Sequence, residues 1–231
     1  RARLGLPARL HARDARVLLV VGRDLFLRTG LLTVFLLLTT RAATRIGTEA
    51  GAAHQAIRQV WLFTALLLDA FAATAQSLVG YFRGARLLRP MRRVAFVACA
   101  WSLGTGVLLA AAMWLAQDTV ARWLVPAVAQ SLFFTPWLVA AAMQPLNALS
   151  FATDGIHWGT SDYRFLRNAM LLATALGTMA LFLPDETVAG SLTQVWVVIA
   201  GWILVRAILG VARIWPGIGN SPFALRPRPG L

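Results

Sequence analysis

Long apolar stretches alternate with short polar stretches along the whole chain. Six of the apolar stretches approach or exceed the roughly 20 residues that a helix needs to cross a bilayer. They are residues 25–40, 60–81, 94–117, 123–153, 168–183 and 188–211. This pattern predicts an all-α membrane protein with six transmembrane helices.

Two of the six stretches differ from a simple crossing. Residues 25–40 are short, and Arg28 lies near their start, where its side chain can snorkel to the lipid headgroups. Residues 123–153 are too long for one straight crossing and contain three prolines, Pro126, Pro136 and Pro145. Because proline bends or interrupts a helix, we predict that this segment begins as an interfacial piece and bends within the membrane.

Arginine is distributed unevenly between the two sides of the predicted bundle. All 22 basic residues are Arg, and only Arg41, Arg45, Arg58 and Arg122 fall on one of the two sides. Cytoplasmic loops carry the excess of positive charge in membrane proteins. We therefore predict that both termini face the cytoplasm.

The composition is typical of a membrane protein and argues against a nucleic-acid-binding or disulfide-rich protein. Apolar residues make up 58% of the chain and charged residues 13%, and the mean hydropathy is +0.67. The net charge of +13 does not indicate nucleic-acid binding, because the basic residues lie between apolar runs rather than on one solvated face. The single cysteine, Cys99, lies inside an apolar run, so no disulfide framework is expected.

The chain is expected to divide into three parts. Residues 1–22 would form a cytoplasmic lead-in or a linker between lobes, residues 23–214 a six-helix transmembrane lobe, and residues 215–231 a disordered cytoplasmic tail rich in Pro and Gly. The first residue is Arg1 and no signal peptide is recognisable, so we expect a piece of a longer protein.

A carboxylate, Asp69, lies near the middle of the second stretch. At 100° per residue, Arg58, Leu62, Asp69 and Gln76 share one face of the helix, which therefore carries a polar stripe. Two interpretations stay open. A neutral Asp69 can hydrogen-bond a neighbouring helix, or Asp69 can bind or relay a cation, since an ionisable side chain at membrane depth is costly and is usually functional.

A second polar row follows the fourth stretch at steps of three or four residues. Its members are Gln144, Asn147, Ser150, Asp154 and His157. Gln144 and Asn147 either line a polar cavity or form ordinary interhelical hydrogen bonds. Asp154 precedes a glycine, so it can equally mark the end of the helix; with His157 and Arg28 it forms a candidate gating or helix-end set.

No pattern for catalysis or for metal binding is recognisable. His54 and His157 fall on opposite sides of the membrane, and no carboxylate stands at metal-ligand spacing beside His54. Nucleophile, metalloprotease and phosphate-loop motifs are missing from the sequence. We expect no enzyme activity, no metal and no cofactor.

Four local stretches carry a resemblance to a known family. The sequences GRDLFLRTG, AAHQ, LLLDAFAATAQSLVG and the pair ATDGIHWG and RFLRNAM begin at Gly22, Ala52, Leu66 and Ala152. Together they resemble the C-terminal half of a multidrug and toxic compound extrusion (MATE) transporter of the DinF-like branch, over residues 16–214. The resemblance implies helices seven to twelve of a twelve-helix antiporter, with an N-terminal six-helix lobe as the missing partner.

The resemblance also implies a function. Such proteins expel organic cations and other amphipathic small molecules through the lipid bilayer in exchange for protons or sodium, with two lobes around a central cleft. The NorM-like branch binds sodium with acids on helices seven and ten. Asn147 occupies the deep position of helix ten here, so protons are the expected coupling ion. Asp69, Gln76, Gln144 and Asn147 are the expected cavity residues.

Two alternatives remain beside xenobiotic export. One is a flippase for lipid-linked molecules, which would need an Arg-lined cavity, and the other is a structural membrane fragment that transports nothing. The expected location is the bacterial plasma membrane, with an organelle membrane as the alternative.

Overall fold

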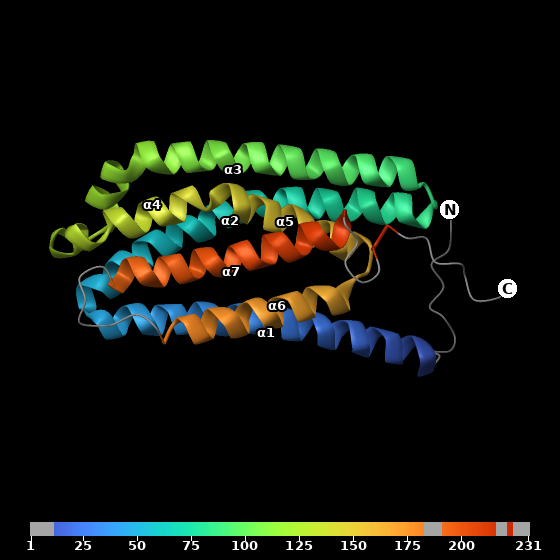
Figure 1. The fold of residues 1–231 in the computed structure, drawn as a ribbon, viewed down its shortest axis with the longest axis horizontal. Coiled ribbons are helices and arrows are strands. Elements are labelled where there is room, and N and C mark those ends of the chain that lie inside the picture. The colour runs from blue at the N-terminus through green and yellow to red at the C-terminus, as the bar shows by residue number, and fades with distance from the viewer. Residues whose placement is uncertain (1–11, 183–190, 216–220, 224–231) are drawn as a thin grey trace, which may run out of the picture.

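The computed structural model describes residues 12–182, 191–215 and 221–223. Its regular elements in these residues are all helical, and they lie side by side along the long axis of the molecule (Figure 1). The elements are α1 (Ala12–Ile46), α2 (Thr48–Gly84), α3 (Leu88–Leu124), η1 (Ala127–Leu132), α4 (Phe134–Ala142), α5 (Gln144–Gly159), α6 (Tyr163–Ala180) and α7 (Ser191–Ile214). With α4 and α5 counted as one crossing, the order matches the predicted six-helix membrane fold.

Three of the helices, α2, α3 and α7, are long and apolar enough to cross a membrane. Helices α2 and α3 have 37 residues each. At 1.5 Å per residue they are about 55 Å long, well beyond the roughly 30 Å of the hydrocarbon core. Both helices therefore extend past the bilayer, which the predicted spans 60–81 and 94–117 did not include.

The ends of the chain differ from expectation where the structure describes them. Helix α1 begins at Ala12, inside the predicted lead-in 1–22. Phe223, in the predicted disordered tail, is buried in a cluster that includes Met91 and Ile214, so this point is anchored to the bundle. Residues 1–11, the predicted span limits 183 and 188, and residues 216–220 and 224–231 of the tail lie outside the described residues.

The fourth segment is divided into three helical pieces, as its prolines predicted, and the position of its first piece at the membrane interface stays a prediction. Pro126 caps η1, and Met143 separates α4 from α5. Pro145 lies in the first turn of α5, where its missing N–H removes no helical hydrogen bond. Helix α5 then continues to Gly159, beyond the predicted limit at residue 153.

Helix α5 lies at the centre of the bundle, in contact with α2, α3 and α7. Glycines let these helices approach closely, as small residues do in membrane proteins. A Cβ atom at Gly106 of α3 would lie 2.7 Å from the Cα atom of Pro145, and a Cβ atom at Gly159 would lie 2.6 Å from the carbonyl oxygen of Gln76. A Cβ atom at Gly155 would collide with the backbone of Ala72 on α2.

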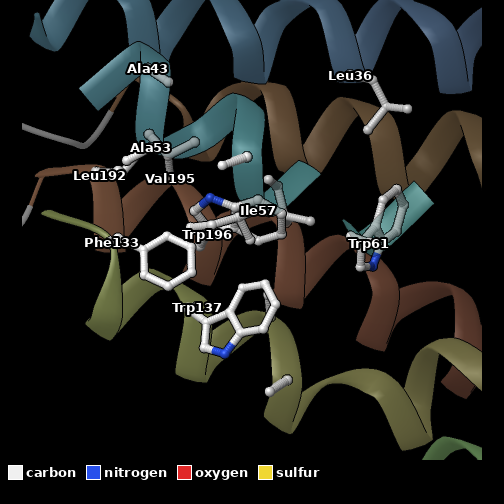
Figure 2. Packing of buried hydrophobic residues seen from close by; sticks show 14 of the residues in the cluster. Leu36, Ala43, Ala53, Ile57, Trp61, Phe133, Trp137, Leu192, Val195 and Trp196 are labelled. Carbon is white, nitrogen blue, oxygen red and sulfur yellow. The ribbon is translucent and has the colours of Figure 1, made fainter. Parts of the chain in front are cut away.

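An aromatic core fills the other part of the bundle, among α2, α4 and α7. Figure 2 shows Phe133 and Trp137 directed toward Ile57 and Trp196. The rings of Phe133 and Trp137 stack with their centroids 5.0 Å apart. The indole N–H of Trp137 donates to the carbonyl oxygen of Met113 at 2.9 Å, so this buried polar group is satisfied.

Candidate functional site

The four predicted cavity residues fall into two places. Asp69 and Gln76 are exposed on α2, at the margin of the face that carries the buried residues Leu68, Ala72 and Val79 of the same helix. Asp69 forms no hydrogen bond or ion pair with any residue of the described ranges. Its place at the lobe surface leaves it free to meet water, a ligand or another part of the complete protein.

Gln144 and Asn147 instead lie fully buried inside the lobe. The side-chain N–H of Gln144 donates to the Thr64 hydroxyl of α2 at 3.1 Å. Both amide atoms of Asn147 are buried and have no hydrogen-bond partner in the described part of the chain. Leaving a buried polar group unpaired lowers the stability of a protein by about 1–3 kcal/mol. The side-chain amide of Asn147, in the first turn of α5, can therefore still donate and accept hydrogen bonds.

A second group of polar side chains gathers toward one end of the bundle. We call this end, the right-hand end in Figure 1, the basic end; it contains the start of α1, the α2–α3 connection, the α5–α6 connection and the end of α7. Near it, Arg28 of α1 and Arg206 of α7 both donate to Oδ2 of Asp154 on α5, at 2.5 and 2.7 Å. We name these three residues the Arg–Asp–Arg triad.

The triad is enclosed by protein and carries one surplus positive charge. The Arg206 side chain is 6% exposed and that of Asp154 15%. Each guanidinium also lies over an indole ring, Arg206 over Trp202 at 4.5 Å and Arg28 over Trp158 at 5.6 Å. Cation–π contact of this kind compensates part of the lost hydration of a buried guanidinium.

The triad corrects two expectations. Arg28 does not snorkel away from the bundle, because the opposite charge of Asp154 holds it against α5. Asp154 does not end its helix, because α5 continues to Gly159. The glycine after Asp154 serves close packing against α2 instead of termination.

His157 lies beside a second ionic group at the basic end. Its Nδ1 is 3.6 Å from Oδ2 of Asp162 in the α5–α6 connection, and Arg213 of α7 donates to the same oxygen at 2.9 Å. Burial alone would raise the pKa of Asp162, but His157 and Arg213 outweigh it, and the pKa lies below its ordinary value. Asp162 is therefore a carboxylate at neutral pH and holds α5, α6 and α7 together.

A third ion pair joins α1 to α6. Asp24, almost fully buried, accepts from Arg167 at 2.7 Å and from its neighbour Arg23 at 3.0 Å. The three groups together connect α1, α5, α6 and α7 near one end of the lobe. Asp69 and Asn147 take part in none of them.

No local pattern in the sequence predicts these pairings. One signal for the triad was present: Arg206 stands alone in the apolar run 188–211, and a lone intramembrane charge needs an opposite partner. Asp154, the acid near the same end of another span, was the candidate partner. Asp24 and Asp162 carried no such signal, since each lies at a span end where charged residues are ordinary.

Metal binding finds no support in the geometry of the described residues, where no three His, Cys, Asp or Glu side chains come together. His54 lies in α2 near the end opposite to His157, and its ring contacts that of Trp196 with centroids 5.5 Å apart. What the lobe offers instead is an exposed acid, a buried unpaired amide and paired charges.

Comparison with known proteins places these features in a family. The model of the MatE family matches residues 25–183. The Arabidopsis thaliana protein DETOXIFICATION 45, chloroplastic, is 30% identical over 189 residues, which cover 81% of this chain and 33% of that protein. DETOXIFICATION 44, chloroplastic, of the same plant is 28% identical over 208 residues, which cover 90% of this chain and 38% of that protein.

Solved structures show the same fold. An outward-facing multidrug resistance MATE family transporter of the MOP superfamily superposes with a TM-score of 0.80 at 18% identity, over 87% of this chain and 45% of that one. A MOP superfamily transporter from Pyrococcus furiosus, described as having a binding pocket of reverse polarity, gives a TM-score of 0.79 at 17% identity.

The chain thus spans less than half the length of the relatives that it matches. Members of the matched family are transporters and not enzymes. The family model covers more than half of the chain, and the resemblance inferred from the sequence is confirmed at the level of the family: the chain belongs to the MatE family.

Proposed function

We propose that this chain is the C-terminal lobe of a secondary active antiporter of the DinF-like branch. The complete protein would export organic cations or other amphipathic xenobiotics in exchange for protons, and sodium is the less favoured coupling ion. The extent of the match supports the assignment to one lobe, since the chain covers 45% of a solved relative with the same fold.

The observation that carries the proposal is the exposed polar stripe of α2. Asp69 and Gln76 are exposed, and Asp69 has the large exposed apolar side chain of Leu66 as its neighbour three residues earlier. A carboxylate turned to lipid is costly, so intramembrane acids face protein or a water-filled cavity. The second lobe would supply that surrounding, and the stripe would line the cleft between the lobes.

Proton coupling agrees with the chemistry of the stripe. One unpaired carboxylate is enough to take up and release a proton, whereas a bound metal cation needs several oxygen ligands at once. Asp69 is an exposed carboxylate with no ion pair among the described residues.

The test uses the full-length parent protein in inverted membrane vesicles. Transport of a fluorescent organic cation is followed with an imposed pH gradient and then with a sodium gradient. The proposal expects transport driven by the pH gradient alone. Transport driven by the sodium gradient and not by the pH gradient would overturn the proposed proton coupling. No transport with either gradient would overturn the proposed antiport mechanism.

Asp69→Asn tests the carboxylate itself. Because Asp69 has no partner in the described structure, the variant should fold normally and lose most of its pH-driven transport. Asp118→Asn, which neutralises an exposed acid near the far end of α3, is the matched control and should transport normally. Undiminished transport by Asp69→Asn would remove this residue from the mechanism.

We also propose that both termini are cytoplasmic and that the membrane is a bacterial plasma membrane. The basic end supports the orientation, because it holds the arginine-rich α2–α3 connection. The relatives include proteins named as chloroplastic, so an organelle membrane is the alternative.

A lipid-linked cargo is the second candidate, favoured by the surplus charge of the Arg–Asp–Arg triad. An arginine guanidinium can donate two parallel hydrogen bonds to one phosphate. In Arg28 the buried Nε has no partner among the described residues, so it could donate one of them. Binding of an anionic lipid-linked sugar to the full-length protein, weakened at least fivefold by Arg28→Gln, would favour this cargo over organic cations.

A further inference from the structure

A groove of about 460 Å³ runs between α2 and α3 on the surface of the lobe. Its walls are mostly apolar and include Phe71, Leu78 and Phe82 of α2 with Val94, Val97 and Trp101 of α3. The groove is separate from the polar stripe. Phe71 and Leu78 each follow a stripe residue by two positions, and two positions correspond to roughly 160° around the helix axis.

One end of the groove is strongly basic. Arg93 lines the groove itself, beside Pro90 at the start of α3. Four more arginines lie at or beside the α2–α3 connection: Arg83 at the end of α2, Arg86 in the connection, and Arg89 and Arg92 at the start of α3. Residues 81–94 contain no acid. Within the described ranges no carboxylate pairs with any of these five arginines, and Nη1 of Arg83 is buried without a hydrogen-bond partner.

The groove therefore has a charged end at the depth of the lipid headgroups and an apolar end at the depth of the acyl chains. From Arg93 to Trp101, α3 advances about 12 Å. Arg93 directly precedes the apolar stretch 94–117, which places its guanidinium at the headgroup level and Trp101 in the hydrocarbon region. An amphipathic anion with an apolar chain fits these dimensions and this charge.

We propose that the α2–α3 groove binds one anionic phospholipid, with the phosphate on Arg93 and an acyl chain along the apolar walls. Basic residues close to a membrane span attract anionic headgroups. The exposed arginines of the α2–α3 connection strengthen the attraction, and the groove between the helices supplies a defined place for one chain. This site does not depend on which compound the protein transports.

The experiment is native mass spectrometry of the full-length parent protein in detergent. The probes are phosphatidylglycerol and phosphatidylcholine with identical acyl chains, added at equal concentrations. We expect one bound phosphatidylglycerol per chain and a preference over phosphatidylcholine of at least about fivefold, as expected for one neighbouring arginine. Equal retention of the two lipids would overturn the proposal.

Arg93→Gln should lower the affinity for phosphatidylglycerol about fivefold and that for phosphatidylcholine clearly less, because the choline cation offsets the charge of the same phosphate. Arg164→Gln is the matched control, because Arg164 is also exposed at the basic end, on α6, and lies outside the groove. An equal loss in both variants would show diffuse attraction without a site and would overturn the proposal.

Ala98→Phe tests the apolar part of the groove, since Ala98 lines it and is only partly buried. A larger side chain there should displace the acyl chain and reduce the binding of both lipids. Unchanged retention of phosphatidylglycerol in this variant would place the bound lipid elsewhere.

Discussion

In the Arg–Asp–Arg triad, two guanidiniums share one carboxylate oxygen, so its members are not equivalent. Removing Arg206 leaves Arg28 paired with Asp154, a neutral group. Removing Asp154 leaves two buried guanidiniums with no opposite charge. The consequence of a substitution therefore depends on the charge that it leaves behind and less on the number of contacts that it deletes.

Asp154→Asn should destabilise the full-length protein by about 3–5 kcal/mol, the usual effect of leaving buried charge uncompensated. Arg206→Gln should cost clearly less. Thermal unfolding in detergent, followed by tryptophan fluorescence, measures both, with the exposed-acid variant Asp118→Asn as the control. Equal destabilisation by the two triad variants would contradict this account of the charges.

Asn147→Leu should have opposite effects on stability and on function. The buried amide has no partner among the described residues, so an apolar side chain of similar shape should stabilise the protein by about 1–3 kcal/mol. If the amide meets substrate or water during transport, as predicted, pH-driven efflux should fall. A variant that is both more stable and fully active would show that Asn147 has no role in transport.

Gln144→Leu is the matched comparison for that experiment. Gln144 is buried like Asn147, and its Oε1 also lacks a partner among the described residues, but its side-chain N–H donates to the hydroxyl of Thr64. Its replacement therefore removes one unmet acceptor together with one hydrogen bond that is already made. It should therefore stabilise the protein less than Asn147→Leu does, or not at all.

At the scale of the elements, the packing of α5 depends on glycine. Gly106→Ala in α3 should cost about 1–3 kcal/mol, because the new Cβ atom would lie 2.8 Å from the Cβ atom of Ala148 and would push α3 away from α5. Gly104→Ala, two positions away in the same helix, meets nothing within 4 Å and should be neutral or stabilising by less than about 1 kcal/mol. The difference in thermal stability between the two variants checks the close approach.

The elements were largely predictable, because the length of an apolar run decides whether a helix can cross a bilayer. The bend of the fourth segment was predictable as well, since proline acts locally. Helix limits were not, because α2 and α5 continue beyond their apolar runs into polar sequence. The pairings of Arg28 and Arg206 with Asp154 depend on which helices become neighbours, and no local pattern contains that information.

At the scale of the whole molecule, the two ends of the bundle should lie on opposite sides of the membrane. In a cysteine-free background of the full-length protein, Arg89→Cys in the first turn of α3 should react with a membrane-impermeant maleimide only after the cells are permeabilised. Glu49→Cys, near the start of α2 at the other end, should react in intact cells. The reverse pattern would invert the orientation, and equal labelling of both sites would contradict the predicted crossings.

The lobe as a unit was predictable from four short stretches in the right order, whereas the split of the candidate site was not. The sequence grouped Asp69 with Asn147 because both are polar at membrane depth. The fold places one on the outer face of α2 and the other inside the lobe, since helix rotation decides which face is buried and depth does not.

The shared carboxylate of the triad also makes the order of mutations matter in the evolution of this protein. A lineage that first loses Arg206 passes through a stable intermediate, from which Asp154 and Arg28 can later be lost together. A lineage that first loses Asp154 passes through a poorly folded protein. A genetic selection that begins with Asp154→Asn should therefore recover second-site changes at Arg206 or Arg28, and homologues that lack the acid should not retain both arginines.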